Sequence, residues 1–154
     1  MPHPPLSWSA WAEVVAAALQ GLADGQTYVV SAPASLARPA KRPGVAKRLT
    51  GRRYVRVAPW VSFVRLEDHL LGSCISDDRS IGFPLSAQEK EQLVALGWHE
   101  PSPGQGPTYF RWFPDDVAET AYLALADADR AADLAGLTMR DVFGVSDPAD
   151  LVIA

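Results

Sequence analysis

The side chains able to do acid–base, nucleophilic or metal chemistry are few and scattered in this sequence. Its histidines are His3, His69 and His99, and no two of them stand at the spacing of a metal-ligand pair. The single cysteine, Cys74, lies in a predicted strand that alternates it to the face opposite His69, so we expect a buried, inert thiol. The adjacent carboxylates fall at predicted turns or caps, where solvent surrounds them: Glu67-Asp68, Asp77-Asp78 and Asp115-Asp116. The sequence therefore predicts no catalytic residue, no metal site and no cofactor.

Positive charge is concentrated in one stretch of the chain. Residues 25–66 hold nine Lys or Arg and no Asp or Glu, whereas the formal net charge of the whole chain is −4. Proline and glycine are frequent over 33–53, and both oppose helix and central strand. The sequence predicts a long basic loop over 33–53, with these cations: Arg38, Lys41, Arg42, Lys47, Arg48, Arg52 and Arg53.

Two interpretations of this basic loop stay open. Its cations favour a contact with nucleic acid or with an acidic protein, and a nucleic-acid-associated regulator binding through residues 38–56 is the alternative function. The other interpretation gives the loop no binding role: it is a solvated loop that keeps an edge strand from pairing with another chain. Only Tyr54 offers a stacking aromatic ring in this stretch, and the rest of the chain is acidic, so nucleic acid is the less favoured partner.

The first half of the chain reads as one helix followed by strands. Apolar residues recur at helical spacing over 9–23, and β-branched and aromatic residues predict a strand over 26–32. Residues 54–67 predict a strand or a hairpin, interrupted at Pro59 because proline cannot donate to a strand ladder. A further strand is expected over 69–76.

The second half carries the clearest local signals. Ser86 and Glu89 stand at the spacing of a helix capping box, and Gly97 is a natural helix terminator. The aromatic run 108–113 predicts a strand with Tyr109, Arg111 and Phe113 on one face and Phe110 and Trp112 on the other. A last helix is expected to begin near Asp115, where the helix dipole favours acidic side chains.

These elements predict an α+β fold in the order α-β-β-β-α-β-α, with an antiparallel sheet of four to five strands and flanking helices. The 154 residues, 48% of them hydrophobic, suit one domain over 8–154 preceded by a flexible tail over 1–7. No apolar run reaches the ~18 residues of a membrane span, and the first residues do not look like a secretory signal. We therefore expect a cytoplasmic protein with no membrane contact.

Three segments together resemble a known family: YVRV at 54–57, the run over 85–101 and the run over 142–151. The most specific parts are Leu-Gly-Trp-x-x-Pro at 96–101 and Phe-Gly-Val-x-x-Pro at 143–148. They resemble the actinobacterial Tir-chaperone/YbjN-like domains, called TY-Chap domains, which share the fold of type III secretion chaperones. The resemblance covers roughly residues 8–151.

The resemblance implies a non-enzymatic, chaperone-like or adaptor domain that holds a segment of a partner protein on its sheet. It also implies that the partner is another protein or a second copy of the chain in a homodimer. From strand alternation alone, we expect four residues to contact that partner: Tyr54, Arg56, Phe110 and Trp112.

Overall fold

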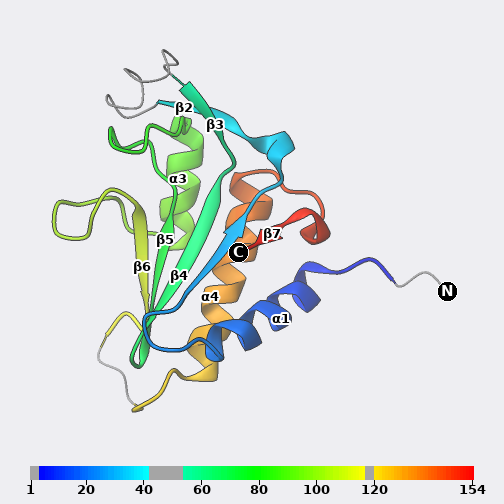
Figure 1. Ribbon diagram of the computed structural model, residues 1–154, viewed down its shortest axis with the longest axis vertical. Helices are drawn as coiled ribbons and strands as arrows, with labels where there is room; N and C mark the ends of the chain where they lie inside the picture. The colour runs from blue at the N-terminus through cyan, green and yellow to red at the C-terminus, as the bar shows by residue number, and fades with distance from the viewer. Residues whose placement is uncertain (1–3, 42–53, 117–119) are drawn as a thin grey trace.

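The computed structural model describes residues 4–41, 54–116 and 120–154. It confirms the predicted α+β class, with three α-helices and a five-stranded antiparallel sheet in these residues (Figure 1). The helices are α1 (Trp8–Gln20), α3 (Ala87–Leu96) and α4 (Leu125–Leu137). No helix in the described part of the chain is both long enough and apolar enough to cross a membrane.

The strands form two separate antiparallel sheets. The larger has the order β6-β5-β4-β1-β7, and the smaller is a hairpin of β2 and β3 that extends beyond the N-terminal end of β4 (Figure 1). The strands are β1 (Thr27–Ser31), β2 (Arg38–Lys41), β3 (Tyr54–Val57), β4 (Trp60–Leu66), β5 (His69–Cys74), β6 (Tyr109–Phe113) and β7 (Val152–Ile153). The short β7 was not predicted, because two residues are too few to show a strand period.

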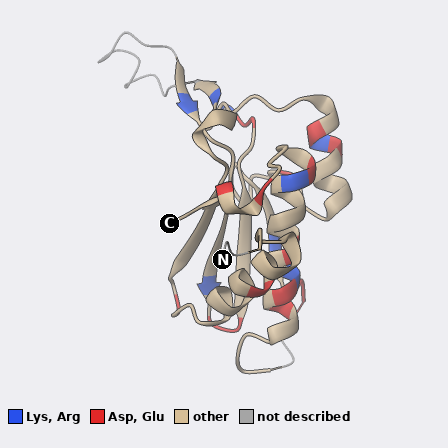
Figure 2. Ribbon diagram, turned by 90° about the vertical axis from the view of Figure 1, so that its right-hand side faces the viewer, with Lys and Arg blue, Asp and Glu red and all other residues tan. Residues whose placement is uncertain are grey.

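The helices lie along one face of the larger sheet (Figure 2). Alternate strand residues on that face are fully buried beneath α1 and α4, and we call it the core face: Val30, Val61, Phe63, Leu70, Cys74, Tyr109 and Phe113. The rings of Phe63 and Phe113 meet edge to face at 6.3 Å. The core is therefore a two-layer sandwich of helices and sheet.

Side-chain hydrogen bonds cap the first turns of helices α1 and α3. Ser7 caps α1 by accepting a hydrogen bond from the Ala10 amide at 3.0 Å. The predicted capping box is present in α3, because Ser86 and Glu89 each accept a hydrogen bond from the other's backbone amide, at 3.1 and 2.9 Å.

The Leu-Gly-Trp corner that follows α3 has a structural role. Gly97 ends the helix with a φ of +111°, and a Cβ there would lie 1.9 Å from the Nη1 of Arg111. The next residue, Trp98, is buried and its indole donates to the hydroxyl of Thr138 at 3.0 Å. That hydroxyl donates in turn to the carbonyl of Leu134 at 2.6 Å, which joins the corner to α4.

The expected start of the last helix was wrong. Helix α4 begins at Leu125, after an extended Ala124, rather than near Asp115. Contacts with the sheet hold the acidic pair outside the helix: Asp115 pairs with Arg111 of β6, and the Asp116 carbonyl bonds His69 of β5. These contacts outweigh the modest preference of acidic residues for a helix start. Residues 117–119, which follow the acidic pair, lie outside the described residues.

The predicted basic loop is in part ordered structure. It contains a 3-10 helix (Ala34–Leu36) and strand β2, which pairs with β3 so that Pro39 stands opposite Arg56. Proline is tolerated there because both strands of a two-stranded sheet are edges. The expected hairpin over 54–67 is divided at Pro59 into β3 and β4, which belong to different sheets. Five of the predicted cations lie outside the described residues: Arg42, Lys47, Arg48, Arg52 and Arg53.

Candidate functional site

The face of the larger sheet that points away from the helices is the candidate site, and we call it the open face (Figure 2). The strand register assigns to it Thr27, Val29 and Ser31 of β1, Trp60, Ser62, Val64 and Leu66 of β4, His69, Leu71 and Ser73 of β5, and Phe110 and Trp112 of β6. Thr27 and Leu66 are exposed and the other ten are half-buried.

The composition of the open face is unusual for a surface in contact with water. An antiparallel sheet with one solvated face normally carries polar side chains on it. Here seven of the twelve residues are aliphatic or aromatic, and none is Asp, Glu, Lys or Arg. A contiguous apolar surface of this kind is typical of a binding site.

The open face is organised in rows that cross the strands. One row runs through directly opposed residues of four strands and ends on an indole: Thr27, Val64, Leu71 and Trp112. The neighbouring row carries small hydroxyl residues at its centre: Val29, Ser62, Ser73 and Phe110. Directly opposed side chains lie close enough to contact one another. The face therefore offers bulky apolar groups beside serine hydroxyls that can bond a peptide backbone.

One corner of the open face is hollowed. Four residues line a cavity of about 240 Å³ there: His69, Trp112, Pro114 and Asp115. The imidazole of His69 and the indole of Trp112 meet edge to face, with ring centroids 6.0 Å apart.

Among the twelve residues of the open face, only His69 has a side chain that gains or loses a proton near neutral pH. Its Nδ1 lies 2.7 Å from Oδ1 of Asp68 and its Nε2 lies 2.9 Å from the carbonyl oxygen of Asp116. The backbone hydrogen bond to Asp116 and the bond to the Asp68 carboxylate raise the pKa of His69 above its usual value. Both ring nitrogens face acceptors, so only the protonated ring satisfies both.

The structure brings together two of the four residues predicted to contact a partner. Phe110 and Trp112 lie side by side on the open face, as alternation predicted. Tyr54 and Arg56 lie on the β2–β3 hairpin instead, where Tyr54 is 60% exposed and Arg56 donates to the Ala37 carbonyl at 2.6 Å.

Sequence reasoning missed most of the open face. The sequence predicts Val64 and Leu71 in strands but in no site, because alternation does not say which face the helices cover. Three of the five tryptophans are half-buried, two of them on this face, whereas Trp11 and Trp98 belong to the core.

Arg38, a predicted cation of the basic loop, is held within the fold. Its guanidinium donates to both carboxylate oxygens of Glu89, at 2.7 and 2.6 Å, and to the carbonyl of Pro84 at 2.9 Å, and it lies over the ring of Phe83. Burial alone would raise the pKa of Glu89, but the hydrogen bonds from Arg38 and Ser86 hold it below its usual value. Arg38 therefore anchors the hairpin to α3.

The remaining reactive groups do not converge. Cys74 is fully buried on the core face, opposite in alternation to His69, and burial raises the pKa of its thiol far above the usual value. A thiol held neutral in this way is a poor nucleophile. Among residues 4–41, 54–116 and 120–154, no three His, Cys, Asp or Glu side chains lie together as metal ligands would.

Comparison with known proteins supports the resemblance seen in the sequence. A family model described as T3SS (YopN, CesT) and YbjN peptide-binding chaperone 3, or TY-Chap3, matches residues 4–154. No curated protein and no solved structure matches the chain.

Proposed function

Because the chain belongs to the TY-Chap3 family of peptide-binding chaperones, we propose that it binds a segment of another protein chain on its open face, without catalysing a reaction. The observation that carries this proposal is a largely apolar sheet face, without Asp, Glu, Lys or Arg, that the helices leave uncovered. Covering water-exposed apolar surface with a partner favours binding by about 25 cal/mol for each Å² buried.

We place the segment across the face rather than along an edge of the sheet. Strand addition needs a free row of backbone amides and carbonyls. At the β6 edge, His99 already pairs with Phe110 through two backbone hydrogen bonds of 2.9 and 3.1 Å. At the other edge, β7 has only two residues. Both edges therefore offer little room for an added strand.

The composition of the face selects the chemistry of the segment. With no Asp, Glu, Lys or Arg among the twelve, a charged side chain bound away from the His69 corner would lose its hydration without gaining an ionic partner. We propose that the bound segment presents apolar or aromatic side chains to Val64, Leu71 and Trp112. Its backbone polar groups then face the hydroxyls of Ser62 and Ser73.

The hairpin residues enter this proposal as an extension of the surface. Tyr54 and Val55 are exposed on β3, which leads directly into β4 (Figure 1). We propose that Tyr54 and Arg56 contact the part of the segment that extends past Trp60. The partner is another protein or a second copy of the chain, and we place the complex in the cytoplasm, where the buried thiol of Cys74 stays reduced.

A peptide selected from a random library displayed on phage tests the proposal. Its affinity would be measured by fluorescence anisotropy for the wild-type protein, for Leu71→Asp on the open face, and for Val94→Asp. Val94 is 46% exposed on α3, on the side of the sheet that carries the helices, and is the matched control. We expect Leu71→Asp to weaken binding at least tenfold, about 1.4 kcal/mol, and Val94→Asp to leave it unchanged.

Two outcomes would contradict the proposal: no peptide enriched above a blank surface, or equal affinity for the wild type and Leu71→Asp. Alanine variants then map the contact. We expect Trp112→Ala and Phe110→Ala to weaken binding more than Tyr54→Ala does, because the first two lie on the open face itself. A dimer whose monomerised form gains peptide affinity would identify the second copy as the competing occupant.

A further inference from the structure

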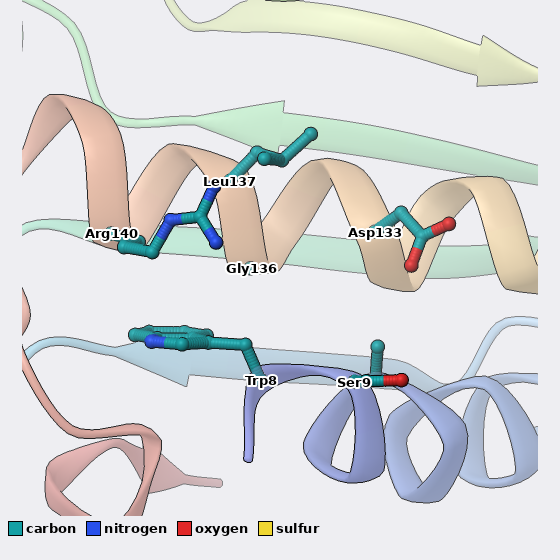
Figure 3. Close-up of a pocket in the computed structure, with 7 residues that line it drawn as sticks. Trp8, Ser9, Asp133, Gly136, Leu137 and Arg140 are labelled. Atoms are coloured by element: carbon teal, nitrogen blue, oxygen red, sulfur yellow. The ribbon is translucent and has the colours of Figure 1, made fainter.

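A separate cavity lies on the helical side of the molecule, where the first turn of α1 faces the last turns of α4 (Figure 3). Its volume is about 280 Å³, and its principal lining residues are Trp8 and Ser9 of α1 with Asp133, Gly136 and Arg140 on or just beyond α4. The sheet separates it from the open face, so it is independent of the proposed peptide site.

The wall and the floor of this cavity are fixed by packing. The indole of Trp8 forms one wall and meets the buried indole of Trp11 edge to face, with centroids 5.9 Å apart. Gly136 forms the floor, and a Cβ there would already lie 3.4 Å from Trp11 and 3.6 Å from Trp8. A glycine inside a helix costs about 1 kcal/mol relative to alanine. A Cβ at Gly136 would fill part of the space between α4 and the two indoles, at ordinary contact distances.

Opposite charges stand at the two ends of the cavity (Figure 3). Arg140 lies in a π-helical turn (Thr138–Val142), and Asp141 orients its guanidinium by accepting from Nε at 2.8 Å and from Nη2 at 3.2 Å. Nη1 of Arg140 takes no part in that pair. At the other end, Asp133 is exposed and forms no hydrogen bond or ion pair with another described residue.

The spacing of these charges follows the period of a helix. Asp133 lies in α4 and Arg140 lies seven residues further on, in the π-helical turn that continues α4, so about two helical turns, on the order of 10 Å, separate them. Gly136 and Leu137 lie between them on the same side. Charged residues on one face of an extended segment would instead be about 7 or 13 Å apart. If a second helix lies along α4, two of its own residues that are seven apart are separated by the same distance as Asp133 and Arg140.

We propose that this cavity receives one face of an amphipathic helix of a partner protein. An acidic side chain of that helix pairs with Arg140, and a basic side chain seven residues away pairs with Asp133. A large apolar side chain between them packs on Trp8. The volume of about 280 Å³ suits one such side chain and is below the range of most small-molecule sites. This is helix-in-groove recognition with charges that set the register.

A designed helical peptide tests the proposal on the full chain. The probe is an alanine-based, hydrocarbon-stapled helix with a glutamate and an arginine seven residues apart and one leucine between them. The readout is the indole N–H signal of Trp8 in a proton–nitrogen NMR spectrum, assigned with Trp8→Phe. We expect the signal to move in a saturable way with this probe, and the affinity to fall at least threefold in Arg140→Gln and in Asp133→Asn.

Matched controls make the test specific. Asp129→Asn changes an exposed carboxylate of α4 outside the cavity and is expected to leave the affinity unchanged. The proposal is overturned if the Trp8 signal does not move at millimolar probe. It is also overturned if a probe with glutamine in place of both charged residues binds equally well, or if an unstapled, proline-containing probe does. Leu71→Asp, which tests the open face, is expected to leave this binding intact, so the two sites fail independently.

Discussion

The two faces of the five-stranded sheet are built from the same strands and differ in what covers them. Along β5, Leu70 is fully buried beneath the helices, whereas its neighbour Leu71 is half-buried on the open face. Both faces are rich in apolar side chains, but only one of them stabilises the fold by burial against α1 and α4. Apolar residues retained on the uncovered face need another explanation, and binding supplies it.

The largest effect that would sharpen this comparison comes from the same substitution at neighbouring positions of β5. Leu70→Ala leaves a cavity in the core and should lower the free energy of unfolding by about 2–5 kcal/mol. Leu71→Ala removes surface that water partly reaches and should cost about 1 kcal/mol or less. Urea denaturation of the two variants measures both values. Equal losses would show that the open face is covered in solution.

A second prediction concerns how tightly the helical layer fits the core face. Gly97→Ala forces a side chain into a positive-φ position and displaces the guanidinium of Arg111, so we expect a loss of about 1–3 kcal/mol. Gly104→Ala is the control, since a Cβ at Gly104 meets no atom within 4 Å. The difference in melting temperature between the two variants measures the effect, and equal melting temperatures would contradict the packing described for the corner.

The β2–β3 hairpin differs from both faces because one ion pair anchors it. Arg38→Gln removes the bonds to Glu89 and should cost about 1–2 kcal/mol at neutral pH. The folded pKa of Glu89 is lowered, so its contribution is present above the ordinary value of 4.5 and is lost as the pH falls through the folded value. The difference in unfolding free energy between wild type and variant should therefore shrink in acid. A difference that stays constant from pH 7 to pH 3.5 would contradict this.

The smallest expected effect belongs to His69, at the corner of the open face. Its folded pKa is raised, so its stabilisation is present in full below the ordinary value of 6.5 and is lost as the pH rises through the folded value. For a partly exposed pair we expect a few tenths of a kcal/mol. The melting temperature of His69→Gln should lie below that of the wild type at pH 5.5 and match it at pH 9. The opposite trend would contradict the two hydrogen bonds assigned to the ring.

Local chemistry made much of the fold predictable. The capping box at Ser86, the stop at Gly97 and the alternation in β6 depend on neighbours in sequence, and all three are confirmed. The start of α4 was not predictable in the same way, because contacts with Arg111 and His69 decide it. Strand β2 was not predicted because Pro39 disfavours a strand in general. It is tolerated here because β2 pairs only with β3 and is therefore an edge strand.

The candidate site was predictable only in part, for a similar reason. A period of two assigns Phe110 and Trp112 to one face, and it does the same for Trp60, Val64 and Leu71 on their own strands. It does not register the strands against each other or say which face the helices cover. Those facts depend on contacts between residues far apart in the sequence.

The five tryptophans allow the central claim to be tested in one spectrum. Trp60 and Trp112 report on the open face, Trp11 and Trp98 on the core, and Trp8 on the cavity between α1 and α4. Their indole N–H signals would be assigned by single Trp→Phe variants and followed as the phage-selected peptide is added. We predict saturable shifts of Trp60 and Trp112, with the two core signals unmoved. Saturable binding that leaves both open-face signals in place would contradict the account.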